Sequence, residues 1–177
     1  ILKLIFPQFK KLEMIKNLNP IAKQNLKSVE FSFLLGVLSI DETDNLDYFL
    51  FKFNISKKDQ KRIKNIRDFF FSKEKVKKID TKSLWKHYYY HGKESLLDII
   101  NYKIFTTKKN EKKFLDLIDY FKNKEQPIFP IKAEYLIRNF NFSEGKKIGE
   151  KLKLLEDFWI KNNFTISKKD MEEIINN

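Results

Sequence analysis

Residues that interrupt helices are rare in this sequence. Only four glycines and four prolines occur among the 177 residues, and in most windows apolar residues recur with the spacing of one helix face. An apolar content of 42 %, with 18 phenylalanines, is enough to build a packed core. We therefore predict an all-α fold, a multi-helix bundle of about seven to nine helices with a small helical tail subdomain.

The predicted helices follow one another through short connections. Asn19-Pro20 is predicted to end the first helix, and Gly36, inside the second, either makes a close packing contact or costs about 1 kcal/mol relative to alanine. Ser56 and Asp59 have the spacing of a capping box that starts the helix over 57–71, and Ser167 and Asp170 repeat it at the start of the last helix. Upstream of the tail, the apolar spacing predicts helices over 1–18, 26–39, 46–54, 57–71, 81–91, 93–105 and 109–123.

The segment 125–130 is the clearest boundary in the chain. It contains Pro127 and Pro130, and two prolines three residues apart disfavour a helix through this stretch. We predict a helical body over 1–124 and a helical tail subdomain over 125–177.

The charge of the chain favours a polyanionic partner. Thirty-six Lys and Arg residues against 24 Asp and Glu give a net charge of +12, and a field of that sign attracts nucleic acid. Only three of these cations are arginines (Arg62, Arg67 and Arg138). Because Lys, Asn, Ile and Phe are all abundant, an AT-rich genome is a second explanation for part of this composition.

The composition also predicts the cellular compartment of the protein. The chain has no cysteine, which rules out disulfides and cysteine-ligated zinc and is typical of a reducing compartment, so we predict a cytoplasmic protein. Neither a signal peptide nor an apolar run of membrane-spanning length is present, and we predict no membrane partner. The chain starts at Ile1 without a methionine, which suggests a piece of a longer protein.

The predicted helix 57–71 has the most one-sided charge in the chain. Asp59 and Asp68 are its only acidic residues, and the lysines at 73, 75, 77 and 78 extend the basic run. The alternative to phosphate binding is a merely solvated face. We predict contacts with RNA phosphates from the cations of this helix, which are Lys57, Lys58, Lys61, Arg62, Lys64 and Arg67.

A second candidate lies in the tail, where Gly145 and Gly149 bracket Lys146 and Lys147. A helix follows, with Ile148, Leu152, Leu155 and Trp159 on one apolar stripe. Free first-turn amides between lysines would form an anion seat, with Lys146 and Lys147 as further phosphate contacts. Taken alone, the residues favour the simpler interpretation, in which Gly145 ends a turn and Gly149 lets another helix pack closely.

Two other clusters are not expected to hold metal. His87 and His91 are four residues apart, a spacing that can place two imidazoles on one ion, but no third ligand is evident and we interpret them as ordinary surface histidines. The acidic segment 41–45 lacks the glycine and distal glutamate of a calcium loop. We interpret it as a solvated turn that caps the following helix.

Two sets of residues form a pattern that extends over most of the chain. The set in the tail is Phe129-Pro130-Ile131, Leu136-Ile137, Gly145, Ile148, Gly149, Leu152, Leu155-Glu156 and Trp159, and the set in the body is Tyr89, Gly92, Lys93, Glu94 and Leu97-Asp98. Together they resemble the C-terminal region of bacterial tRNA nucleotidyltransferases (CCA-adding enzymes) and the closely related poly(A) polymerases. The tail departs from the family pattern where Ala133 and Tyr135 stand near the usual Gly and Asp, and where no glycine occurs between Ile137 and Gly145.

The resemblance implies an RNA-binding body and tail that belong to a larger enzyme. In the family, a catalytic head that uses Mg²⁺ with ATP and CTP lies N-terminal to this region. The present chain has neither the Asp-x-Asp carboxylates nor the Gly-Ser loop that nucleotide transfer needs. We therefore predict no catalytic residue, cofactor or metal site in this chain.

The expected partners are tRNA or other structured RNA and the N-terminal catalytic domain of the same protein. The first alternative is the C-terminal region of a poly(A) polymerase. The alternative from another class is a non-catalytic helical protein-interaction module. The sequence does not determine the oligomeric state.

Overall fold

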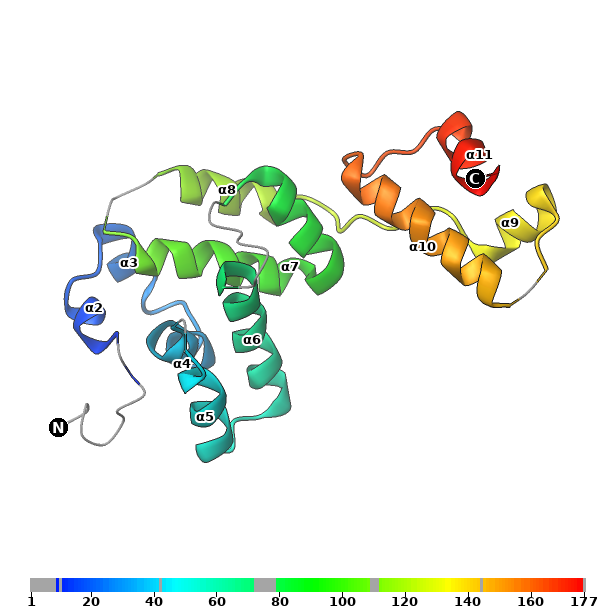
Figure 1. Cartoon of the computed structure of the whole chain (residues 1–177). Coiled ribbons are helices and arrows are strands. Elements are labelled where there is room, and N and C mark those ends of the chain that lie inside the picture. The colour runs from blue at the N-terminus through cyan, green and yellow to red at the C-terminus, as the bar shows by residue number, and fades with distance from the viewer. Residues whose placement is uncertain are drawn as a thin grey trace. The chain divides into compact units, whose positions relative to one another are not determined.

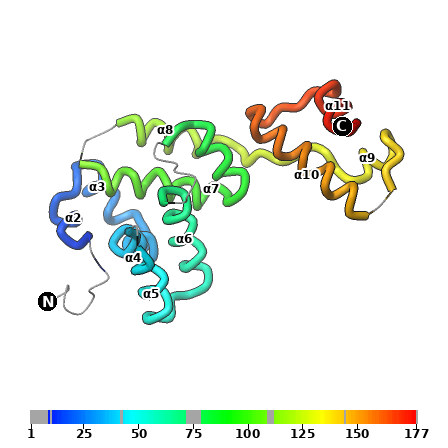
Figure 2. The backbone as a smooth tube through the Cα atoms, viewed as in Figure 1, coloured from blue at the N-terminus to red at the C-terminus, as the bar shows by residue number. Residues whose placement is uncertain are grey.

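The computed structural model describes residues 9, 11–41, 43–71, 79–108, 112–143 and 145–176. These residues form ten α-helices and no strand (Figures 1 and 2), which confirms the predicted all-α multi-helix fold. The chain divides into two compact units, unit 1 (Ile1–Gln126) and unit 2 (Pro127–Asn177). The division falls two residues after the predicted one. No helix among the described residues is long and apolar enough to cross a membrane.

The first helices differ from the predicted ones. They are α2 (Leu12–Lys16), α3 (Pro20–Asn25) and α4 (Phe31–Ser39). No helix was predicted over 20–25, and α4 begins later than the helix predicted over 26–39. The part of the predicted helix 1–18 before Phe9 lies outside the described residues. Asn19-Pro20 was predicted to end the first helix; α2 ends just before it, and Asn19-Pro20 itself starts α3. The Asn19 side-chain oxygen accepts a hydrogen bond from the Ala22 amide at 2.9 Å, with Pro20 in the first turn.

The next elements lie close to their predicted ranges. They are α5 (Asn45–Lys52), α6 (Lys57–Phe71) and α8 (Lys113–Lys122). The start of α6 is fixed by Ser56, whose Oγ accepts from the Asp59 amide at 3.2 Å and donates to the Asp59 carboxylate at 2.6 Å. The capping pair predicted from sequence thus determines where the basic helix begins.

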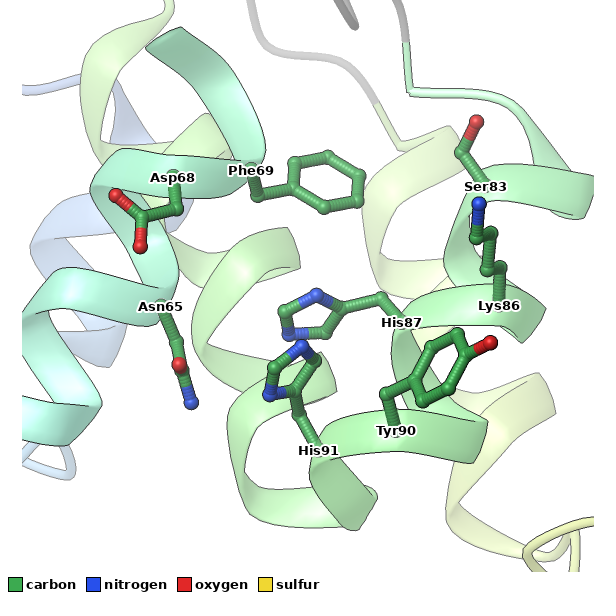
Figure 3. Close-up of a pocket in the computed structure, with 8 residues that line it drawn as sticks. All are labelled: Asn65, Asp68, Phe69, Ser83, Lys86, His87, Tyr90 and His91. Atoms are coloured by element: carbon green, nitrogen blue, oxygen red, sulfur yellow. The ribbon is translucent and has the colours of Figure 1, made fainter. Parts of the chain in front are cut away.

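The longest element is α7 (Thr81–Thr106), which joins the two helices predicted over 81–91 and 93–105. Gly92 interrupts it with φ 80° and ψ 177°, a conformation that residues with a side chain rarely adopt. The half of α7 before Gly92 runs beside α6 (Figure 3). Figure 1 shows α8 on one side of α7 and α4 and α6 on the other.

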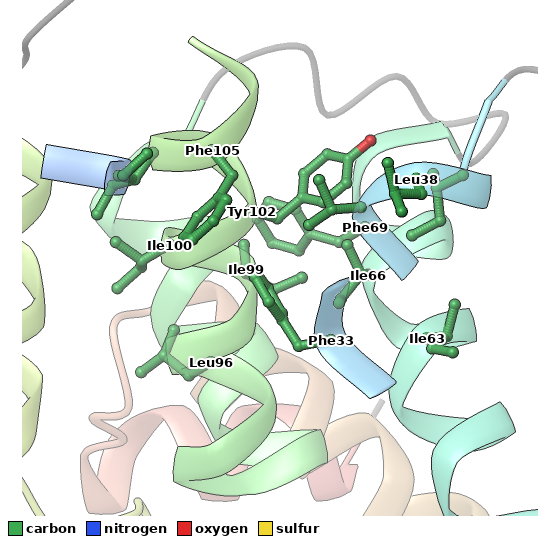
Figure 4. Close-up of a cluster of buried hydrophobic side chains, with 14 of the residues drawn as sticks. Phe33, Leu38, Ile63, Ile66, Phe69, Leu96, Ile99, Ile100, Tyr102 and Phe105 are labelled. Atoms are coloured by element: carbon green, nitrogen blue, oxygen red, sulfur yellow. The ribbon is translucent and has the colours of Figure 1, made fainter. Parts of the chain in front are cut away.

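One apolar core holds unit 1 together (Figure 4). Phe33 from α4, Ile63 and Ile66 from α6, and Ile99 from α7 are almost completely buried. A side-chain carbon at Gly36 would come within 3.3 Å of Ile63 Cγ2. Of the two interpretations of Gly36, the close packing contact is therefore the one that the structure supports.

Unit 2 packs three helices around a smaller core. They are α9 (Ala133–Phe140), α10 (Lys146–Lys161) and α11 (Lys168–Asn176), and α10 contacts both of the others. The core is formed by Ile131, Leu136, Ile148, Leu155 and Ile175. It therefore includes Ile148 and Leu155 of the apolar stripe predicted for the helix after Gly145.

Candidate nucleic-acid interface

The six cations of α6 fall into two groups. Lys57, Lys58 and Lys61 are exposed and join no salt bridge to any residue that the structure describes. Arg62, Lys64 and Arg67 are instead paired with carboxylates of unit 1. The predicted phosphate contacts therefore differ in how available their charges are.

Arg62 is built into the packing between α6 and α7. Its side chain is only 12 % exposed. Its Nε donates to Asp98 Oδ2 at 2.5 Å and its Nη2 to Asp98 Oδ1 at 2.8 Å, and its Nη1 also pairs with Glu30. Hydrogen bonding to Asp98 raises the pKa of Arg62, while burial raises the pKa of Asp98 against the opposing effect of the guanidinium. Because Arg62 remains charged and holds Asp98 in a bidentate pair, Arg62 is a structural residue here rather than an available phosphate ligand.

Arg67 and Lys64 share a carboxylate from α5. Arg67 Nη1 lies 2.6 Å from Asp47 Oδ2, and Lys64 Nζ lies 3.4 Å from Asp47 Oδ1. Arg67 Nε also lies 3.0 Å from Asp68 Oδ1. Both predicted contacts thus have acidic neighbours that reduce their attraction for phosphate. The predicted basic extension at Lys73, Lys75, Lys77 and Lys78 lies outside the described residues.

Two adjoining cavities lie between α6 and α7, and we call them together the α6–α7 groove. The larger one borders the first half of α7, and the smaller one borders the residues around Gly92, including Glu94 and Ser95. The smaller one, about 190 Å³, is lined by Lys58 and Lys61, and the larger one, about 410 Å³, by Lys86 and Tyr90. Asn65 and His91 line both cavities. Exposed lysines thus stand on both helices that border the groove.

The histidine pair corrects half of the prediction of two ordinary surface histidines, because His91 is exposed as predicted and His87 is not. His87 is buried and its Nε2 lies 2.8 Å from Ser95 Oγ, while His91 stacks on it with ring centroids 4.5 Å apart. Burial lowers the pKa of His87 to about 4, and burial together with the charge of Lys61 lowers the pKa of His91. Both rings are therefore neutral at pH 7.

The second predicted site lies at the start of α10, in unit 2. Gly145 occupies the position before the helix with φ 134° and carries no side chain that could accept from the first-turn amides. Lys146 and Lys147 are exposed, and Lys146 Nζ lies 3.7 Å from Glu150 Oε1. Apart from the adjacent backbone of its own helix, nothing lies within 4 Å of where a Gly149 side chain would begin, so the prediction that another helix packs closely against Gly149 is wrong for the part of the chain that the structure describes.

Lys86 and Tyr90 were not predicted as site residues. They are four residues apart on α7 and so lie on one helix face, as do His87 and His91. That spacing was the available signal, but it did not reveal which helix faces them across the groove.

Among the described residues, no group of three or more His, Asp or Glu side chains is placed to hold a metal ion. The lysines of α6 and those of α10 lie in different units, and each group forms its own candidate surface. No protein-family model, curated protein or solved structure matches the chain.

Proposed function

We propose that this chain is the RNA-binding C-terminal part of a tRNA nucleotidyltransferase, which adds CCA to tRNA 3′ ends. Catalysis with Mg²⁺, ATP and CTP is assigned to a head domain outside this chain, as the resemblance implies. The proposed partners are tRNA or similar structured RNA and that catalytic head, and the predicted cytoplasmic location follows from this role. Two features support the proposal: the resemblance and the distribution of positive charge in unit 1.

The observation that carries the proposal is the α6–α7 groove. Lys58, Lys61 and Lys86 line it, are exposed, and have no carboxylate partner within salt-bridge distance among the described residues. Lysines in this state are suited to phosphates, whose contacts release counterions. A double-stranded RNA helix hides its base edges in a deep groove, so recognition through its backbone suits a surface of this kind.

A poly(A) polymerase is the alternative within the same class. The resemblance covers both enzymes through the same residues, and the groove would serve either RNA. The sequence upstream of Ile1 tests the enzyme class, since a Gly-Ser loop followed by Asp-x-Asp would support a nucleotidyltransferase head and an unrelated domain would overturn it.

A protein-interaction module is favoured by one observation in unit 1. An apolar cavity of about 480 Å³ is lined by side chains including Phe31, Leu34, Phe49 and Phe53. Phe31, together with Phe51 on α5, is largely exposed. Such a surface is typical of a protein-binding site.

A salt titration of tRNA binding separates these functions. The binding constant for tRNA falls as salt rises, and the logarithmic plot of one against the other is steeper when more phosphates are contacted. If RNA phosphates lie along the groove, changing Lys58, Lys61 and Lys86 together to alanine makes this plot less steep by about three, roughly one per lost contact. The matched control changes Lys23, Lys27 and Lys112 to alanine, which removes the same charge from exposed positions outside the groove. Absence of tRNA binding at low salt, or equal effects of the two triple variants, would contradict an RNA site in the groove.

A further inference from the structure

The larger cavity of the α6–α7 groove has features that backbone recognition does not require. Asn65, Asp68 and Phe69 line it from α6, and Figure 3 shows the Phe69 ring pointing toward His87 of α7, while the Asp68 carboxylate turns away from the histidine rings. Its volume of about 410 Å³ is within the range of small-molecule sites. A groove that only followed a phosphate backbone would need no hollow lined by rings.

Aromatic rings form one side of this cavity. The His87 and His91 rings are stacked with an interplanar angle of 28°, and Phe69 meets His87 edge-on at 5.2 Å. Tyr90, which is 50 % exposed, lies next to His91 with centroids 6.4 Å apart. Planar side chains at the edge of a polar cavity are the usual means by which proteins stack on an unpaired base.

The charges favour a base over a phosphate inside the cavity. Asp68 lines it, and although its Oδ1 pairs with Arg67 Nε at 3.0 Å, its other oxygen can accept a hydrogen bond from the amino group of a base but not from a phosphate diester, which has no donor. The two imidazoles are neutral at pH 7, because burial lowers the pKa of each. Lys86 is the cation of this cavity, and it is exposed, where a phosphate attached to the bound nucleotide could reach it.

The side-chain amide of Asn65 adds a second polar group. Its Nδ2 donates to Ser95 Oγ at 3.2 Å, and Ser95 Oγ is in turn 2.8 Å from His87 Nε2. This chain of hydrogen bonds holds the amide and the His87 ring in place. A fixed polar edge beside a stacking surface gives a site for one base.

We propose that the cavity lined by Asn65, Asp68, Lys86, Tyr90 and His91 binds one unpaired nucleobase that carries an exocyclic amino group, with its phosphate on Lys86. This inference deepens the proposed RNA-binding function and rests on it. It adds that the preferred RNA has an unpaired nucleotide next to a helix.

The test compares two RNA hairpins with the same stem, one blunt and one with a short unpaired 3′ extension that contains 2-aminopurine. The full chain binds the extended hairpin more tightly, and stacking quenches the 2-aminopurine fluorescence. Tyr90→Leu weakens binding of the extended hairpin about tenfold, in the range measured for base–aromatic stacking, and leaves the blunt hairpin unchanged. The matched control is Tyr48→Leu, because Tyr48 is 53 % exposed on α5 outside the groove.

The outcomes separate the two proposals. If the chain binds both hairpins equally and neither Tyr90→Leu nor His91→Leu alters binding or quenching, the base site is wrong and RNA binding stands. If only the extended hairpin binds, the base site is supported and recognition of paired RNA is overturned. If neither hairpin binds at low salt, both proposals fail. Circular dichroism of each variant identifies any loss of fold.

Discussion

The pair of Arg62 and Asp98 places two opposite charges in the packed space between α6 and α7. Their side chains are 12 % and 5 % exposed, so water screens them little. Without Asp98, Arg62 keeps only Glu30 and Glu94, whose side chains are mostly exposed, and losing the buried partner of such a pair costs more than the intact pair contributes. At the scale of single residues, Arg62 therefore joins two helices of unit 1.

The change Asp98→Asn tests this role. We expect the free energy of unfolding to fall by about 3 kcal/mol, because the Arg62 guanidinium stays charged and mostly buried after it loses its bidentate partner. Urea denaturation measures the difference. The control is Asp47→Asn, which breaks the more exposed pairs with Lys64 and Arg67 and is expected to cost less than about 1 kcal/mol. Equal losses in the two variants would contradict a structural role specific to Arg62.

At the scale of elements, α6 shows where local sequence is sufficient to predict a helix, and α3 shows where it is not. The range 57–71 was predicted as the structure has it, because the Ser56 cap and the buried Ile63 and Ile66 are local signals. The start at Asn19 was missed. Asn19 is held by Nδ2 hydrogen bonds to the carbonyls of Ile104 at 2.7 Å and Thr107 at 3.0 Å, and these acceptors are distant in the sequence.

Gly145 lies just before α10 and Gly149 lies inside it, and substitution by alanine is expected to have opposite effects on stability at the two positions. Gly149 lies in the helix with no atom near its missing side chain, so Gly149→Ala should stabilise unit 2 by up to about 1 kcal/mol. Gly145 has φ 134°, so Gly145→Ala should destabilise it by about 1 kcal/mol or more. Thermal unfolding followed by circular dichroism measures both.

The same Gly149→Ala variant also tests the predicted anion seat. If an RNA backbone approaches Gly149 closely, the variant binds tRNA more weakly despite its greater stability. Unchanged affinity would remove Gly149 from the RNA surface.

At the scale of the whole molecule, the chain contains two separate cores. The core of unit 1 draws on helices from α3 to α8, whereas that of unit 2 is formed around α10 by far fewer residues. A smaller core buries a smaller fraction of the surface and gives less stability. The two units therefore need not unfold together.

The two tryptophans report on the units separately, since Trp85 lies in unit 1 and Trp159 in unit 2. In the Trp85→Phe variant, fluorescence follows unit 2 alone, and in Trp159→Phe it follows unit 1. We expect unit 2 to unfold at a lower urea concentration and with a smaller m-value, because it exposes less surface. Coincident transitions in the two variants would show that the units unfold as one.

The sequence by itself determined the all-α fold, most helix ranges and the two-part organisation, because helix periodicity, caps and prolines act within a few residues. Only the tertiary structure decided which cations are available. Asp47 and Asp98 come from other helices to neutralise Arg67 and Arg62, and the facing of α6 and α7 places Lys86 and Tyr90 in one groove with Lys61. These pairings depend on contacts between distant segments, and no local pattern encodes them.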